Sequence, residues 1–369
     1  MEIRELAAGV FFADTLEGKL VVAGELTDSH PELGAEIPGL PARPDGLALD
    51  DPRPKAKFPG LTRETSLVQR GQVLHHFANH ELLAIELMAL FLLRFPRAPA
   101  GLRRAVARTI EEEQSHLVLY RDRMESFGVA LGDVPVSRFF WDCLCGMTDP
   151  LEYLSGMSLT LEQANLDFSR HYIQRFTDIG DEQTAALLQR IHEDEIGHVK
   201  LGAMWFERLR EPSDSRSLWD RYRAALPEPL SPARAIGIGF DRASREAAGL
   251  DSAFIESLQG FGYSKGRPAD LYLFNPSAEL HLAAGRVEAV PQALAGLARD
   301  LETLPMFLGG VDDVVLVSRP PRAAFLAGLR TAGFALPEFV TPGQLAHRSR
   351  SFRSLKPWAW SPDSNEVLG

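Results

Sequence analysis

Two copies of one short pattern, Glu-x-x-His, constrain the fold of this chain more than any other feature. Glu113 with His116 forms the first copy and Glu195 with His198 the second, at a separation of 82 residues. A spacing of three places the two side chains of each copy on one face of a helix, where they can reach a common point. The sequence therefore predicts two similar helical segments that present the same pair of side chains.

A further glutamate precedes each copy, on a helical stretch of its own. Glu81 and Glu162 lie 81 residues apart in mostly apolar or small surroundings. Apolar periodicity, with proline, glycine or capping residues at the ends, predicts four long helices over 67–95, 101–127, 148–180 and 181–211. Because the link over 128–148 is longer than the others, these helices suit a four-helix bundle with a crossover connection.

The remaining sequence predicts three further parts. Turn-forming residues dominate 1–66, which we expect to be a short opening helix and an ordered arm packed on the bundle. Two strands, over 270–276 and 311–318, flank a helix over 291–304 and predict a small α/β domain. The expected organisation is therefore an arm over 1–66, a bundle over 67–211, a linker of two short helices over 212–264, and an α/β domain with a tail over 265–369. The tail is basic and contains Arg348, Arg350, Arg353 and Lys356.

Six side chains are the candidate metal ligands and, through the metals, the candidate catalytic groups: Glu81, Glu113, His116, Glu162, Glu195 and His198. One Glu from each of two helices plus Glu-x-x-His from the other two is the donor set of di-iron and di-manganese carboxylate bundles. Four buried carboxylates are costly without cations, and two divalent ions would cancel their charge. Carboxylate and imidazole donors suit iron or manganese. We therefore expect two iron ions as cofactors, with manganese or a mixed pair as alternatives.

Other residues near these positions have simpler interpretations. A single Glu on an amphipathic helix is usually solvated, and a single buried His is usually structural, so the argument rests on the joint spacing. Glu86 is the main rival of Glu81, but it lies about 140° further round the helix, so both cannot face one centre. The flanking residues are expected to be solvated, structural or, at most, supporting: Glu111, Glu112, Glu193, Asp194, His80, His192 and Tyr120. Tyr120 follows His116 by four residues and either packs or assists the centre.

Composition excludes several classes of function. The net charge of −11 disfavours nucleic acid and anionic lipid, which are themselves polyanions. The longest apolar run has seven residues, too few to span a bilayer, and the first residues lack the pattern of a signal peptide. The only cysteines, Cys143 and Cys145, are too few and too close for a disulfide framework or a thiolate zinc site. We therefore expect a cytoplasmic protein without a membrane or nucleic-acid partner, whose cysteines pack in a loop.

The helical part resembles the ferritin-like superfamily of di-iron carboxylate proteins. The segment from Glu81 to Ile85 is similar to the first-helix ligand motif of bacterioferritins. Four motifs resemble more closely an uncharacterised bacterial ferritin-like family, a domain of unknown function, over residues 1–250: 80–87, 113–116, 161–167 and 194–199. The resemblance implies a ferritin-like bundle and the six ligands named above, but no substrate. That family is distantly similar to di-iron tRNA hydroxylases, although the acidic charge gives no support for tRNA.

The C-terminal part resembles the pre-ATP-grasp domain of ATP-grasp ligases. The resemblance lies in segments 271–279, 299–302, 333–339 and 356–361. A nucleotide-binding core would follow in that family, and the sequence contains no phosphate-binding glycine loop, since Gly237 and Gly239 lack the rest of a dinucleotide fingerprint. We therefore assign no ATP chemistry to this chain. A separate ATP-grasp protein is one expected partner, and a docking or homodimerising domain is the simpler alternative.

Three functions fit these features. The leading hypothesis is a dioxygen-activating di-iron oxidoreductase of the hydroxylase or oxygenase type, which acts on a small organic substrate in a pathway with an ATP-grasp ligase. The second is a ferroxidase or peroxide scavenger without an organic substrate. The third is a metal-stabilised scaffold that docks an ATP-grasp partner.

Overall fold

Four long helical segments form the core of the N-terminal part. The computed structural model places them at α3 (Leu67–Arg94), α4 (Ala100–Glu125), α7 (Gln163–Asp178) and α8 (Glu182–Arg208). All four expected helices are present within three residues of the expected bounds, although the third begins as α6 (Pro150–Tyr153) and continues through a π-helix, η1 (Leu154–Glu162), before α7. Side chains close the ends as expected. Ser66 caps α3 and forms a capping box with Gln69, and Asp181 caps α8.

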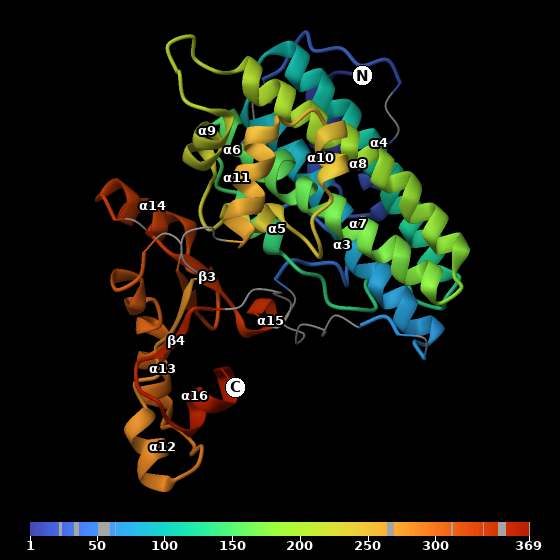
Figure 1. Cartoon of the computed structure of the whole chain (residues 1–369). Coiled ribbons are helices and arrows are strands. Elements are labelled where there is room, and N and C mark those ends of the chain that lie inside the picture. Colours follow the sequence, from blue (N-terminus) through green and yellow to red (C-terminus); the bar gives the residue numbers. More distant parts are fainter. Residues whose placement is uncertain are drawn as a thin grey trace. The chain divides into compact units, whose positions relative to one another are not determined.

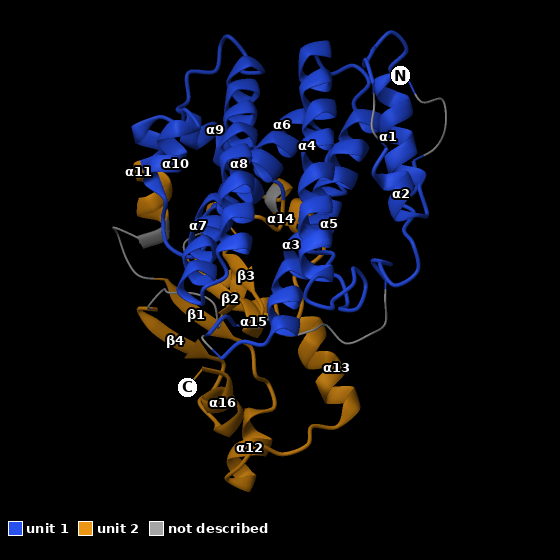
Figure 2. Ribbon diagram, turned by 90° about the vertical axis from the view of Figure 1, so that its right-hand side faces the viewer, with its two compact units in different colours: residues 1–227, 234–255 blue, residues 228–233, 256–369 orange. Residues whose placement is uncertain are grey.

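The structure describes residues 1–21, 24–32, 37–50, 60–62, 64–263, 269–310, 313–334, 336–345 and 352–368. The chain is mainly helical, with a small parallel sheet near its C-terminus. It divides into two compact units, residues 1–227 with 234–255 and residues 228–233 with 256–369, which are coloured separately in Figure 2.

Within the first unit, the long helices pack in pairs. Helix α3 lies against α4, α7 lies against α8, and α8 also contacts α4 and η1 (Figure 1). Most residues of α3 from Gly71 to Leu93, including all of those from Glu81 onward, are buried. Among the described residues, α3 is the one helix long and apolar enough to cross a membrane, but 83% of its most apolar window is buried inside the protein. Such burial is typical of the central helix of a folded core.

Three buried ion pairs tie the N-terminal residues to these helices. Helix α1 (Ile3–Phe12) packs on α3, and α2 (Leu16–Lys19) follows it. The ammonium of Lys19 and the guanidinium of Arg43 both contact the carboxylate of Glu86 on α3, at 2.9 and 2.6 Å. Arg103 on α4 binds Asp28 at 3.0 Å. Because these charges are almost completely buried, removal of one partner would leave an uncompensated charge in the interior.

Shorter helices complete the helical part. They are α5 (Phe139–Leu144), α9 (Leu218–Ala225), the 3₁₀ turn η2 (Pro232–Ala235), α10 (Arg242–Ala247) and α11 (Ser252–Tyr263). The linker was predicted to contain two short helices, but it contains α9, η2, α10 and α11, so that prediction was wrong. The prolines at 227, 229 and 232 and the glycines at 237, 239 and 249 interrupt the helical pattern and divide this stretch into shorter segments. Cys143 lies within α5 and Cys145 follows it directly, so the expected loop there is largely a helix.

The second unit contains a sheet of four parallel strands in its described residues. The strands are β1 (Asp270–Leu273), β2 (Val314–Leu316), β3 (Glu338–Val340) and β4 (Ser354–Pro357), in the order β3-β2-β1-β4. The helical segments in this unit are α12 (Ala278–Ala284), α13 (Gln292–Leu301), η3 (Leu304–Phe307), α14 (Ala323–Thr331), α15 (Pro342–Leu345) and α16 (Pro362–Leu368). Alternate residues are buried on the two faces, as in parallel sheets covered on both sides.

The expected basic tail is largely part of this sheet. Strand β4 pairs with β1, and the side chains of Arg353 and Lys356 both bind the carboxylate of Asp270. Arg348 and Arg350 lie outside the described residues. Strands β1 and β2 lie in the apolar runs Leu271–Phe274 and Val314–Val317 and were predicted. Strands β3 and β4 lie in no such run, which is why they were missed.

Candidate metal centre

The six candidate ligands lie together in the interior of the helical core. Their side chains are only 1–5% exposed. Their donor atoms form two groups that share Glu113: Glu81, Glu113, His116 and Glu195 in the first, and Glu113, Glu162 and His198 in the second. Within each group, the donor atoms all lie within 4.8 Å of one another. This buried cluster has the composition and spacing to hold metal ions.

Glu113 lies between the two histidines. One of its carboxylate oxygens is 3.1 Å from His116 Nδ1, and the other is 3.2 Å from His198 Nδ1. The two imidazole centroids are 5.8 Å apart. A carboxylate in this position can bridge two ions, with one oxygen for each.

Each histidine is also held from its outer side by a carboxylate of the opposite helix. Glu112 on α4 is 2.8 Å from His198 Nε2, and Asp194 on α8 is 3.1 Å from His116 Nε2. These contacts orient both rings so that Nδ1 faces the cluster, which is a common way to fix a metal-binding imidazole. Of the flanking residues, Glu112 and Asp194 therefore support the centre, although their carboxylates are 57% and 45% exposed. Glu111 and Glu193 belong to neither group.

Two buried carboxylate oxygens support a fit to cations. Glu162 Oε2 and Glu195 Oε2 are buried and lack a hydrogen-bond partner among the described residues. Buried polar atoms are nearly always hydrogen-bonded or bound to an ion. Unpartnered carboxylate oxygens within a cluster of donor atoms are therefore consistent with bound cations. A carboxylate- and imidazole-rich donor set without a thiolate is the type that iron, manganese and zinc accept.

Burial and mutual repulsion change the acidity of the cluster. Burial, together with the charge of Glu113, raises the pKa of Glu195 to about 8 and that of Glu81 well above its ordinary value. Burial likewise raises the pKa of Glu162 to about 7. Burial alone would also raise the pKa of Glu113 and lower that of each histidine, but their mutual contacts outweigh it: the pKa of Glu113 falls, while those of His116 and His198 rise. Without metal, the cluster therefore retains protons that bound cations would displace.

The π-helix brings Glu162 into the cluster. Glu162 is the last residue of η1, and all nine residues of η1 are buried. Segment η1 approaches α8 so closely that a Cβ added at Gly202 would lie 2.1 Å from Ser158 Cβ. Only glycine permits this approach, and Gly202 stands one helical turn after His198. π-Helical turns within α-helices occur frequently at functional sites.

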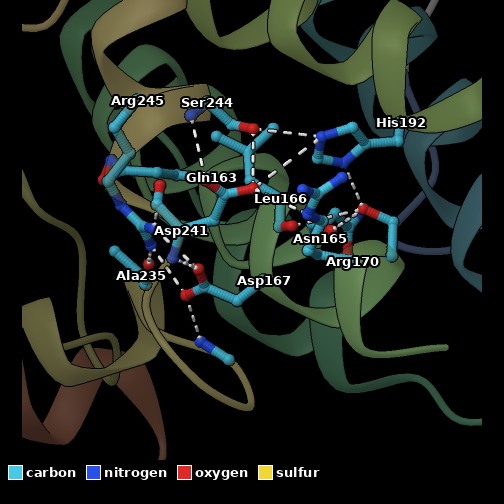
Figure 3. A network of polar contacts seen from close by, with 12 residues as sticks. Gln163, Asn165, Leu166, Asp167, Arg170, His192, Ala235, Asp241, Ser244 and Arg245 are labelled. Carbon is cyan, nitrogen blue, oxygen red and sulfur yellow. Dashed lines mark hydrogen bonds and ion pairs between the residues drawn. The ribbon is translucent and has the colours of Figure 1, made fainter. Parts of the chain in front are cut away.

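A polar network behind α7 connects to the cluster through Asn165. The amide of Asn165 donates to Glu195 Oε1 at 3.2 Å. Two residues further along, Asp167 forms a fully buried pair with Arg245 of α10, at 2.7 and 2.8 Å (Figure 3). His192 contacts Ser244 in the same network (Figure 3). Its other ring nitrogen contacts the hydroxyl of Ser169. His192 thus holds helices together and does not bind Glu195 or another candidate ligand.

Sequence reasoning missed Asn165, although a signal was present. Asn165 follows Glu162 by three residues, which is the same helical-face spacing that identified the two Glu-x-x-His pairs. The buried ion pair of Asp167 is formed with Arg245, which is 78 residues away in the chain, so no local sequence pattern predicts it.

The remaining candidates lie at the edge of the cluster or away from it. Glu86 faces Lys19 and Arg43 and belongs to neither donor group. His80 stacks on Phe140, with ring centroids 4.6 Å apart, and burial lowers its pKa to about 4. Tyr120 is buried and packs on Phe77. Burial, followed by the charges of Glu81 and Glu195, raises its pKa, so its phenol lies near the first group.

The family comparison agrees with the extent of this helical part. No curated protein and no solved structure matches the chain. Residues 9–256 match the family described as "Protein of unknown function (DUF455)", and this match includes all six cluster residues. Because it covers well over half of the 369 residues, the chain belongs to the DUF455 family.

Proposed function

We propose that this chain is a di-iron oxidoreductase of the ferritin-like type that reacts with dioxygen and oxidises a small organic molecule. The observation that carries the proposal is the pair of buried donor groups that share Glu113. A Glu from each of two helices and a Glu-x-x-His pair from each of the other two are the donor set that di-metal carboxylate proteins use. A reduced iron pair supplies electrons to dioxygen when it is bound there.

The protein's own residues would position and protect this chemistry. Glu81, His116 and Glu195 would hold one ion, Glu162 and His198 the other, and Glu113 both. Glu112 and Asp194 keep the imidazoles oriented, and the helical core around the cluster excludes water. The raised pKa values of Glu162 and Glu195, about 7 and 8, would allow these carboxyls to exchange protons near neutral pH if they are released from the ions.

The second candidate is a ferroxidase or peroxide scavenger without an organic substrate. The cavity beside Glu162 and His198 has a volume of about 10 Å³. This is close to the least that holds one water molecule, so it favours a very small reactant over an organic one. Iron that is oxidised over many turnovers, with no dependence on an added organic compound, would favour this candidate.

The test is iron loading without oxygen followed by exposure to dioxygen. We expect metal analysis to find about two iron ions per chain after anaerobic loading, and the absorbance of the protein to change on mixing with dioxygen. Glu113→Ala removes the shared donor and should abolish both results. Glu111→Ala, two residues away and outside both groups, is the matched control and should leave them unchanged.

Two outcomes would refute the proposal. A folded protein that binds no iron would exclude a di-iron centre. A protein that binds two ions but never reacts with dioxygen would instead favour the metal-stabilised scaffold that docks an ATP-grasp partner.

A further inference from the structure

We infer that Asn165 is a positioning residue of the proposed metal centre. Its side-chain amide holds one carboxylate oxygen of Glu195, so that the other oxygen is the one left to bind an ion. This inference rests on the metal ions of the proposed function, but not on their reaction with dioxygen. It adds a binding mode for one ligand and a task for a residue that is not among the six candidate ligands.

The contact between the amide and the carboxylate is direct. Asn165 Nδ2 donates to Glu195 Oε1 at 3.2 Å. An ionised carboxylate only accepts hydrogen bonds, so the nitrogen of the amide, and not its oxygen, has to face it. Hydrogen bonds to ionised groups are stronger than those between neutral groups. The amide therefore restricts the rotation of the Glu195 carboxylate.

The second oxygen of Glu195 has no such partner. Glu195 is 2% exposed, and its Oε2 is buried without a hydrogen-bond partner among the described residues. This oxygen lies 3.9 Å from His198 Nδ1, on the side of the cluster. A buried acceptor without a partner is costly, and a bound cation would remove that cost. Because Oε1 is engaged by the amide, Glu195 would bind through Oε2.

The equivalent glutamate of the other Glu-x-x-His pair is held differently. Both oxygens of Glu113 face the cluster, at 3.1 and 3.2 Å from the Nδ1 atoms of the two ligand histidines. The position of α3 that corresponds to Asn165, 81 residues earlier, is Ala84, whose side chain has no donor. The amide is therefore present in one half of the repeat only, and it distinguishes Glu195 from Glu113.

Neighbouring contacts hold Asn165 in register with Glu195. One turn further along α7, the hydroxyl of Ser169 donates to the backbone carbonyl of Asn165 and lies 2.7 Å from His192 Nδ1, one turn before Glu195 on α8. His192 Nε2 lies 3.0 Å from the hydroxyl of Ser244 on α10 (Figure 3). Contacts at two successive turns therefore join α7 to α8. A supporting contact of this kind keeps a metal ligand in a precise orientation.

The test removes the amide and leaves all six candidate ligands in place. Asn165 is half-buried, so Asn165→Ala should fold. Each metal-free protein is titrated with Co(II) in the presence of a competing chelator, and the d–d absorption bands of the bound ions report their coordination. We expect about two Co(II) ions per wild-type chain. In Asn165→Ala, the affinity for at least one ion should be roughly 10–100-fold lower, and the bands should change.

Ser169→Ala is the matched control. It removes the adjacent contact between the same two helices, but Ser169 contacts none of the candidate ligands. If Asn165 only held the helices together, both variants would lose stability in urea unfolding and neither would change the bands. We expect Ser169→Ala to keep the affinity and the bands of the wild type.

Asn165→Asp provides a second test that preserves the shape of the side chain. It replaces the donor with an acceptor, so two carboxylates would face each other and Glu195 would lose its hydrogen bond. Co(II) binding should be weakened at least as much as in Asn165→Ala. This variant also decides the matter if Asn165→Ala does not fold.

The outcomes separate this inference from the proposed function. Wild-type affinity and bands in Asn165→Ala or in Asn165→Asp, or an equal loss of affinity in Ser169→Ala, would overturn the inference and leave the di-iron function standing. A wild type that binds two ions but never reacts with dioxygen would overturn the proposed function and leave this inference standing. A wild type that binds no metal would overturn both.

Discussion

Replacing Gly202 with alanine tests whether the contact between η1 and α8 positions the metal cluster. The added Cβ would lie 2.1 Å from Ser158 Cβ and 2.7 Å from Ser158 Oγ. Because carbon atoms in contact are normally at least about 3.5 Å apart, the two segments must separate by roughly 1.4 Å. Ser158 Cβ is fixed to the backbone, so no side-chain rotation can relieve the clash.

The expected loss of stability follows from two opposing effects. Overpacking a core costs about 1–3 kcal/mol, and the value should be near the upper end here because a backbone segment has to move. Alanine gains up to about 1 kcal/mol over glycine in a helix. The net expectation for Gly202→Ala is a loss of about 2 kcal/mol in the free energy of unfolding of the metal-free protein.

Gly197→Ala on the same helix is the matched control, since its Cβ would meet nothing within 4 Å. It should gain roughly 0.5–1 kcal/mol. Urea unfolding measures both variants, and metal titration shows whether the displacement of Glu162 from His198 weakens the binding of the second ion in Gly202→Ala. Equal stability of the two variants, with unchanged metal affinity, would show that the close approach of η1 to α8 has no part in forming the site.

Two further predictions concern charge. The pKa values of Glu162 and Glu195, about 7 and 8, exceed the ordinary value of 4.5, so the stability they contribute to the metal-free protein is complete below pH 4.5 and is lost as the pH rises to 8. Metal affinity should increase as the pH rises over the same range, because metal binding releases these protons. Competition titrations at several pH values measure this affinity, and a constant affinity would contradict the prediction. Glu86→Ala leaves Lys19 buried without its carboxylate and should cost about 3–5 kcal/mol in urea unfolding, yet the folded protein should still bind two ions. Glu81→Ala should have the opposite effect: weaker metal binding with little loss of stability in the metal-free protein. If only Glu86→Ala lost metal, the assignment of Glu81 as the ligand on α3 would be wrong.

The sequence was sufficient to identify the cluster because helical periodicity is local. Glu113 and His116 share a face whenever their segment is helical, and the repeat at 82 residues indicated which other pair belongs with them. The same interval separates Glu112 from Asp194, so the supporting carboxylates follow the repeat as well. The repeat does not show that each of these carboxylates contacts the histidine of the other helix: Glu112 contacts His198, and Asp194 contacts His116.

Features that depend on distant contacts could not be predicted. Glu86 is neutralised by Lys19 and Arg43, which lie 67 and 43 residues before it in the chain. The strands β3 and β4 lie in no continuous apolar run and become recognisable only through pairing with β2 and β1. In each case the deciding interaction joins segments that are far apart in the chain, and periodicity contains no information about it.

The π-helix explains why a repeated sequence need not give two equivalent halves. Glu81 and Glu162 occupy corresponding positions of the two hairpins, but Glu81 lies on the regular helix α3 whereas Glu162 ends η1. A π-helix has hydrogen bonds to the fifth residue instead of the fourth, so its turns are wider and its side chains point in different directions. The cavity is found beside the π-helix and involves Glu162. The donor residues of the two halves match, so the difference between them arises from the backbone of one segment.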